Sequence, residues 1–389
     1  MNEPNILLDF SDLDNKNYQQ ETKPSDIIFD EKPLPPEKNP YGHLPCPTDI
    51  YDYLLPDGSK FCLFSDPYAT MVYVDVYTGA NHGRYWLEKR LEEHTFTERE
   101  LRLIEFLSTH RVATSSQIQR VVFPGVEKRK IVTEFLQRCR KRGIICAFTW
   151  VSPIDEADGP KKPLVYGLTR VGAEAVEILF HKQVPEDFWF HPIKFTRGRG
   201  PSMTPFFFDL AANELYSQLQ RIDRCISWQR RPQIRLNGGG SHHPGAVFEV
   251  IKDIGEFRIF WLEVVRPGKD WIEKTKHRFK RTQTAIESLS PYQRPVRVII
   301  VTDGDARIPF LAKMAEKYMP NVQCRFTNDE RLLQGLNKET FIAWNKETQQ
   351  MTLSSIPFMQ EGYEGATASE YFSEQTLNVE DEDELNYEE

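Results

Sequence analysis

The sequence predicts an α+β protein of more than one domain, with acidic ends that do not fold. Its 389 residues correspond to two or three domains. Apolar residues follow helical or strand periodicity between positions 95 and 345, whereas residues 1–40 are polar, acidic and Pro-rich without such periodicity. No apolar run approaches the ~20 residues that span a bilayer, and residues 1–10 lack the basic start of a secretion signal. We therefore expect a soluble, cytoplasmic protein that does not bind membranes.

The charge is distributed unevenly along the chain. The net charge is −8, yet residues 361–389 contain eleven acidic residues and no Lys or Arg, and residues 1–40 have a net charge of −5. Without these two ends, residues 41–360 have a net charge of +8. A basic body between acidic ends is typical of a protein that binds nucleic acid. The six cysteines show no CxxC spacing, which predicts reduced thiols rather than a zinc site or a disulfide framework.

Composition, charge and apolar periodicity together divide the chain into six segments. Residues 41–94 are predicted to form a small β-containing unit, with short strands at 60–64 and 71–76. The other segments are a disordered acidic segment (1–40), a winged helix-turn-helix (95–182), a linker (183–202), a restriction-endonuclease-like α/β domain (203–345) and an acidic disordered tail (346–389).

Residues 95–182 have the order of a winged helix-turn-helix: three helices, a two-stranded hairpin and a further helix. Thr97 and Glu100 have the spacing of a capping box at the start of the first helix, and Thr114 or Ser115 caps the short second helix. The third helix is expected at about 127–142, ending at Gly143. Strands at 144–151 and 164–168 and a helix at 171–180 complete the unit.

The third helix has the charge of a DNA recognition helix, with Ile131, Phe135 and Leu136 expected to face the core. Such helices lie in the major groove, where their first residues reach base edges and basic residues neutralise phosphates. A solvated helix face and a protein-docking module remain the alternatives. The predicted groove contacts are Lys128, Arg129, Lys130 and Thr133; the predicted backbone contacts are Arg138, Arg140 and Arg142, with Lys161 and Lys162 at the wing tip.

The order of elements at 203–345, a helix, three strands, then alternating helices and strands, matches the core of the restriction-endonuclease-like fold. Such sites hold Mg²⁺ with an acid near the start of one strand and Glu-x-Lys on the next. Here the acid position is Gly245 and the Lys position is Val265. Only Glu263 remains, with Glu214 on the preceding helix as the candidate second acid. We expect a degenerate domain without a cofactor; Mg²⁺ would be required only by an active site.

The helix expected at 270–289 has a basic stripe. Lys274, Arg278 and Arg281 are spaced i, i+4 and i+7 and therefore share one face. We predict that this face clamps a DNA backbone, with a solvated helix face as the alternative. The glycines at 238–240 are interpreted as a flexible loop, and the histidines at 242–243 as residues without a metal.

Residues 95–330 resemble the replication-relaxation family. Its members sit on plasmids and other mobile elements of Gram-positive bacteria, so the resemblance implies a role in plasmid replication and DNA relaxation. Where relatives tend to have Pro-Asp-Ala, this chain has Pro-Gly-Ala, which weakens any inherited metal chemistry. The resemblance rests on residues 96–143, 165–169 and Gly172 for the winged helix, and on residues 244–247, 260–264 and 271–274 for the second half.

The leading prediction is a protein of a mobile element that binds double-stranded DNA and acts in replication, relaxation or transfer. The first alternative is a metal-dependent nicking nuclease. The second is an adaptor whose acidic tail binds replication or transfer proteins. A tail that instead shields the protein's own basic surface would raise the DNA affinity when it is removed.

Overall fold

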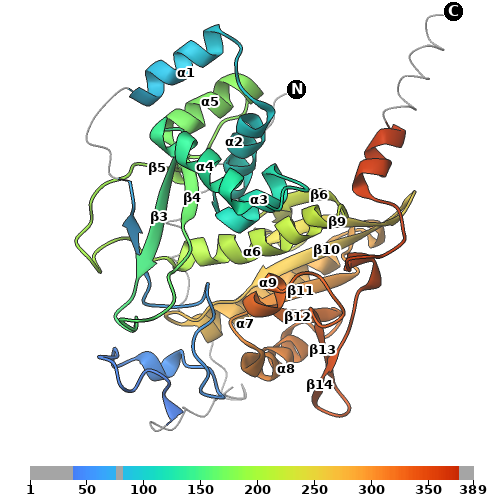
Figure 1. Ribbon diagram of the computed structural model, residues 1–389. Helices are drawn as coiled ribbons and strands as arrows, with labels where there is room; N and C mark the ends of the chain where they lie inside the picture. The colour runs from blue at the N-terminus through green and yellow to red at the C-terminus, as the bar shows by residue number, and fades with distance from the viewer. Residues whose placement is uncertain (1–37, 76–81, 376–389) are drawn as a thin grey trace, which may run out of the picture.

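The computed structural model describes residues 38–75 and 82–375 (Figure 1). Most of the predicted N-terminal disordered segment therefore lies outside the described residues, as does the end of the acidic tail. The chain is a mixed α+β protein with a five-stranded and a seven-stranded sheet, and a two-stranded sheet beside the second. No helix of the described part has the length and apolarity needed to cross a membrane.

The five-stranded sheet forms the smaller unit with five helices, and its strand order is β1-β3-β4-β2, with β5 parallel to β4. Thr97 and Glu100 form the predicted capping box, and Gly143 follows the third helix of the series with a φ of 74°. The elements are β1 (Thr70–Tyr73), α1 (His82–Glu92), α2 (Glu98–His110), β2 (Val112–Thr114), α3 (Ser115–Val122), α4 (Arg129–Lys141), β3 (Ile145–Val151), β4 (Val165–Thr169), α5 (Arg170–Phe180) and β5 (Trp189–Phe190).

Residues 41–94 do not form a separate unit. The strand predicted at 60–64 is wrong, because these residues form turns and irregular structure. The strand near 71–76 is present as β1, but it pairs antiparallel with β3 and so extends the sheet of the next unit. Helix α1 was not predicted; its Leu87 packs in the same core as α2 and α5.

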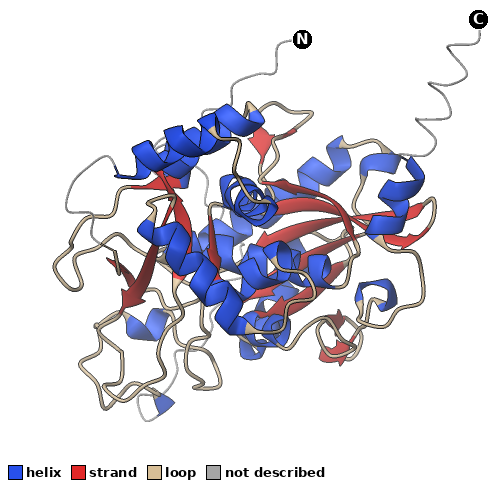
Figure 2. Ribbon diagram, turned by 45° about the horizontal axis from the view of Figure 1, so that its top comes forward, coloured by secondary structure: helices blue, strands red, loops and turns tan. Residues whose placement is uncertain are grey.

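The larger sheet has the order β14-β13-β12-β11-β10-β9-β6. Its centre is parallel from β10 to β12, and the flanking pairs are antiparallel. Helices pack on both faces (Figure 2): α6 and α9 on one, α7 and α8 on the other. The elements are α6 (Thr204–Arg221), β6 (Cys225–Arg230), β7 (Ile234–Arg235), β8 (Ser241–His242), β9 (Ala246–Asp253), β10 (Glu256–Val264), α7 (Trp271–Ser288), β11 (Arg297–Thr302), α8 (Ile308–Tyr318), β12 (Cys324–Asn328), α9 (Asp329–Leu333), β13 (Ile342–Asn345) and β14 (Gln350–Leu353).

Helix α6 lies between the two sheets and joins the two units (Figure 1). Its first turns pack Phe206, Phe207 and Leu210 against the smaller sheet, and its later turns pack Leu215 and Leu219 against the larger one. A helix with two apolar neighbours is buried around most of its circumference, as α6 is. The predicted linker is also packed, since β5 within it pairs with β4. The two units are thus joined through α6, which contributes residues to the core of each.

A polar network also fixes α6 against the smaller unit. The Nδ2 of Asn213 donates to the backbone oxygens of His110 and Val112 at 3.1 and 2.6 Å. The Nε2 of Gln117 in α3 donates to the Leu210 carbonyl at 2.9 Å. Because these groups are buried, breaking one bond would leave an unsatisfied polar atom. We infer that α3 is held rigidly on α6.

Buried His110 predicts acid sensitivity of this junction. Burial lowers its pKa to about 3, although the hydrogen bond with Asn213 opposes the shift. The unfolded chain, with an ordinary pKa of ~6.5, binds this proton first, so His110 contributes stability that is lost as the pH falls below ~6.5. We expect the unfolding free energy of the wild type to fall by about 1 kcal/mol per pH unit between pH 6 and 4, relative to His110→Gln. Urea unfolding at several pH values measures this difference, and parallel pH profiles would contradict it.

Residues 38–69 form an N-terminal strap beside the carboxyl ends of β11 and β12. The Nη2 of Arg307 donates to the carbonyls of Tyr53 and Leu54 at 2.8 and 3.1 Å. The Phe64 amide donates to Asp329 Oδ2 at 3.3 Å. Open α/β sheets bind ligands at the carboxyl ends of their strands. In this chain the strap covers that edge where it contacts Arg307 and Asp329, the residues that follow β11 and β12.

The tail begins later than predicted. Residues 350–353 form β14 at the edge of the larger sheet, and Met359 is buried against the α6 face. Arg224 donates to the carbonyls of Tyr363 and Ala366, and the Ala368 amide donates to the Asp223 carbonyl at 2.8 Å. The expectation of disorder from residue 346 is therefore wrong up to residue 375, because backbone pairing and one buried arginine outweigh the acidic composition.

Candidate nucleic-acid interface

Helix α4 has one buried and one exposed face. Val132, Phe135, Leu136 and Cys139 are buried at i, i+3, i+4 and i+7. Ile131, which was expected to face the core, is 40% exposed. Val132 takes this place because it lies i, i+3, i+4 and i+7 with Phe135, Leu136 and Cys139, whereas Ile131 lies at the edge of the stripe.

Five predicted contacts lie on the exposed part of α4 or just before it. Lys130 makes only a loose ion pair with Glu134, at 3.9 Å between exposed side chains, and such a pair contributes little stability. The Thr133 hydroxyl donates to the Arg129 carbonyl at 3.0 Å. No side chain caps the start of the helix, so its amides add positive potential beside the lysines. The exposed residues of this α4 basic face are Lys128, Arg129, Lys130, Thr133 and Arg138.

The other two arginines predicted to contact the DNA backbone form ion pairs within the protein. Arg140 donates to both carboxylate oxygens of Asp75, at 2.7 and 2.6 Å. Arg142 pairs with the buried Glu100 at 3.0 Å. Both guanidinium groups therefore fix α4 to its neighbours, and their predicted role at the DNA backbone would have to compete with these pairs.

The predicted wing tip is attached to the N-terminal strap. Lys161 is exposed, but Lys162 pairs with Asp155 and lies over the Trp150 ring. Ile154 is buried in one core with strap residues, and Glu156 accepts from Lys60 at 2.6 Å. Among the described residues at this tip, Lys161 is therefore the cation that remains exposed, and the tip is held against the strap.

Glu263 lies in β10, is fully buried and has partners on both oxygens. Its Oε1 is 3.1 Å from His242 Nε2 and accepts from the Thr282 hydroxyl at 3.1 Å. Its Oε2 accepts from Arg278 Nε. Burial alone would raise the pKa of Glu263, but Arg278 and His242 outweigh it and hold the pKa below its ordinary value. The sequence pointed to Glu263 and Arg278 as candidate site residues but not to Thr282. His242 was interpreted only as one of two adjacent histidines without a metal.

These residues do not fit a Mg²⁺ site. Gly245 supplies no carboxylate, and its amide donates to the Leu262 carbonyl at 2.8 Å. Val265 is buried in the core, where an active enzyme of this type would have Lys. The Arg278 guanidinium already neutralises Glu263, whereas Mg²⁺ needs several oxygen ligands in octahedral order. Among the described residues no group of three or more acidic, His or Cys side chains is arranged for a metal ion.

Glu214 does not join Glu263. Residues of a strand alternate between the two faces of a sheet, so Glu263 faces α7 while its neighbour Leu262 faces α6. Glu214, on α6, instead accepts from Gln117 at 2.9 Å and pairs with Arg120, both in α3. The proposed second acid is therefore part of the junction between the two units, and that expectation is wrong.

The basic stripe predicted on α7 is only partly open. Lys274 is exposed. Arg278 turns toward Glu263 and also donates to the His243 carbonyl at 3.1 Å, and Arg281 donates to the Ser241 carbonyl. These two arginines therefore attach the β7–β8 hairpin to α7.

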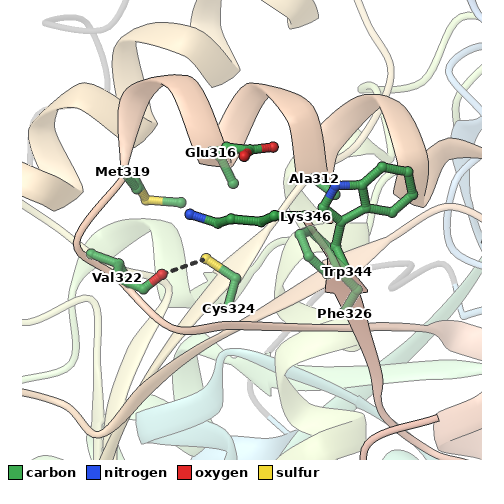
Figure 3. Close-up of a pocket in the computed structure, with 9 residues that line it drawn as sticks. Ala312, Glu316, Met319, Val322, Cys324, Phe326, Trp344 and Lys346 are labelled. Atoms are coloured by element: carbon green, nitrogen blue, oxygen red, sulfur yellow. Dashed lines mark hydrogen bonds between the residues drawn. The ribbon is translucent and has the colours of Figure 1, made fainter. Parts of the chain in front are cut away.

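A small cleft lies between α8 and strands β12 and β13 (Figure 3). The Lys346 side chain crosses it below Glu316, beside Trp344 and Cys324. Its volume is about 60 Å³, far below the ~300–1,000 Å³ of typical ligand pockets. We assign no function to this cleft.

The fold and the candidate surfaces define an α+β protein with two fused units, an exposed basic helix on one and a buried Glu263 paired with Arg278 on the other. The replication-relaxation family model matches residues 104–275, from within α2 to the start of α7. The resemblance predicted from the sequence is confirmed over this range, which associates the chain with replication and relaxation. No curated protein and no solved structure matches the chain.

Proposed function

We propose that this protein binds double-stranded DNA of a plasmid or other mobile element through α4, in replication or relaxation of that DNA. The observation that carries the proposal is the orientation of α4. Its apolar stripe is buried, and Lys128, Arg129 and Lys130 lie together at its exposed, uncapped start. Positive side chains and free helix amides at one place favour a phosphate backbone.

The arrangement of neighbouring elements supports a winged-helix mode of binding. The order α2-β2-α3-α4-β3-β4, with β2 paired to β4 and β4 to β3, fits that fold. Helix α3 is fixed on α6, and the wing loop is fixed on the strap, so α4 would be presented without rearrangement. A rigid reading helix loses little conformational entropy on binding.

In this proposal the larger sheet has no nuclease activity. Glu263 would act as a structural acid that holds Arg278, His242 and Thr282 in place. The domain would thereby support the DNA-binding unit through α6 and add a second basic surface.

A salt titration of binding to supercoiled, relaxed and single-stranded DNA tests this function. We expect the logarithm of the duplex binding constant to fall linearly with the logarithm of salt, by about 0.9 for each neutralised phosphate. The supercoiled samples, analysed on a topology gel with and without Mg²⁺, should remain uncut. The absence of duplex binding would refute the proposal, and metal-dependent nicking abolished by Glu263→Ala would favour the nuclease.

A further inference from the structure

Arginines gather around the strand ends beside the nuclease-like site. Arg230 and Arg231, at the end of β6, both pair with the buried Asp209 of α6, and Arg111 of the smaller unit shares this carboxylate. Across the start of β9, Arg278 and Arg281 of α7 contact the β7–β8 hairpin. We call Arg231, Arg278 and Arg281 the hairpin arginine cluster.

Within the described part of the chain, the carboxylates that contact the hairpin arginine cluster are Glu263 and the shared Asp209. Asp209 is divided among three arginines, and Glu263 pairs with Arg278. Arg281 makes no ion pair with any described residue; its polar contact is the Ser241 carbonyl. Like charges held together in a partly buried place repel each other. A bound anion would relieve this repulsion.

The cluster is accessible and lies beside an open glycine loop. The side chains of Arg278 and Arg231 are 32% and 24% exposed. Gly239 and Gly240 have φ values of 91° and 79°, and a Cβ added at Gly239 would meet no atom within 4 Å. The same Cβ at Gly240 would lie 3.7 Å from Arg281 Nη2. The loop backbone therefore leaves space for a ligand next to the guanidinium groups.

We propose that the hairpin arginine cluster binds a phosphate group of the DNA backbone, at the place where an active nuclease would hold its metal. Planar guanidinium groups match phosphate oxygens in geometry and in charge. Glu263 is a positioning residue in this site, because it orients Arg278 without touching the ligand. This site would add a second DNA contact to the one proposed at α4. Its assignment to DNA phosphate rests on that proposed function.

Two probes distinguish the cluster from the α4 basic face: inorganic phosphate, followed by ³¹P NMR line broadening, and duplex DNA, followed by salt titration. In the full chain, Arg281→Gln is expected to weaken phosphate binding at least five-fold and to lower the duplex salt slope by about 0.9. Glutamine retains a donor for the Ser241 carbonyl, so the fold should persist. Arg281→Lys should restore most of the phosphate binding, and Lys280→Gln, on the same helix, should behave as wild type.

Three results of these measurements would contradict the proposal, each at a different step. Equal phosphate binding by the wild type and Arg281→Gln overturns the site. If phosphate binding depends on Arg281 but the duplex salt slope is unchanged, the site does not bind the DNA backbone. Its ligand is then a small phosphorylated molecule. Phosphate binding that depends on Arg281 in a chain that binds no duplex refutes the proposed function but leaves an anion site.

Discussion

Replacement of Lys128, Arg129 and Lys130 by glutamine is expected to lower duplex affinity by roughly 10²–10³-fold at about 0.1 M salt. Each neutralised phosphate contributes about 0.9 to the logarithmic salt slope, so three lost contacts remove about 2.7 from it. All three residues are exposed, with one loose ion pair between Lys130 and Glu134, and the substitutions should not disturb the core. Fluorescence anisotropy with a labelled duplex at several salt concentrations measures both quantities.

A matched control removes the same charge elsewhere. Lys313, Lys338 and Lys346 are exposed on the part of the chain that carries α8 and β13, away from α4. Glutamine at these three positions should change affinity only slightly, through the general field of the protein. If both triple variants lose affinity equally, binding is diffuse and α4 is not a recognition helix. If neither loses affinity, the α4 basic face is a solvated surface or a protein-docking site.

Substitution of Arg307 by methionine is expected to lower the free energy of unfolding by about 3–5 kcal/mol, because one partner of a buried ion pair is removed. Arg307 and Asp303 are both fully buried, with Nε 2.9 Å from Oδ1. The same guanidinium holds the Tyr53 and Leu54 carbonyls of the strap. Urea denaturation measures the loss, and limited proteolysis should cut earliest within residues 38–69.

Two control variants distinguish the stability lost by leaving a buried charge unpaired from the stability lost by removing any one charge. Asp303→Leu combined with Arg307→Met should recover part of the stability, since no uncompensated buried charge remains. Arg170→Met removes an exposed arginine that pairs with Glu174 across one helical turn, and it should leave stability almost unchanged. A loss of less than about 1 kcal/mol in Arg307→Met would mean that the strap is not held through this pair.

The local pattern of the sequence determined several features of this protein. The capping box at Thr97, the cap at Thr114 and the stop at Gly143 formed as predicted. These signals are local: a side chain and an amide three residues away satisfy each other in any context. The sequence also has Gly245 and Val265 at the two positions where the proposed restriction-endonuclease-like pattern would have an acid and a lysine, and this comparison of residue types needs no structure.

The tertiary structure alone decided which charged groups remain available. Arg140, Arg142 and Arg278 belong to basic patterns in the sequence, yet each pairs with a carboxylate from a distant segment: Asp75, Glu100 and Glu263. Partners so far apart along the chain leave no periodic signal, and their pairing depends on how sheets and helices pack. For the same reason, the sequence could not reveal that Glu214 and Glu263 lie on opposite faces of one sheet, or that the strap covers the carboxyl ends of β11 and β12.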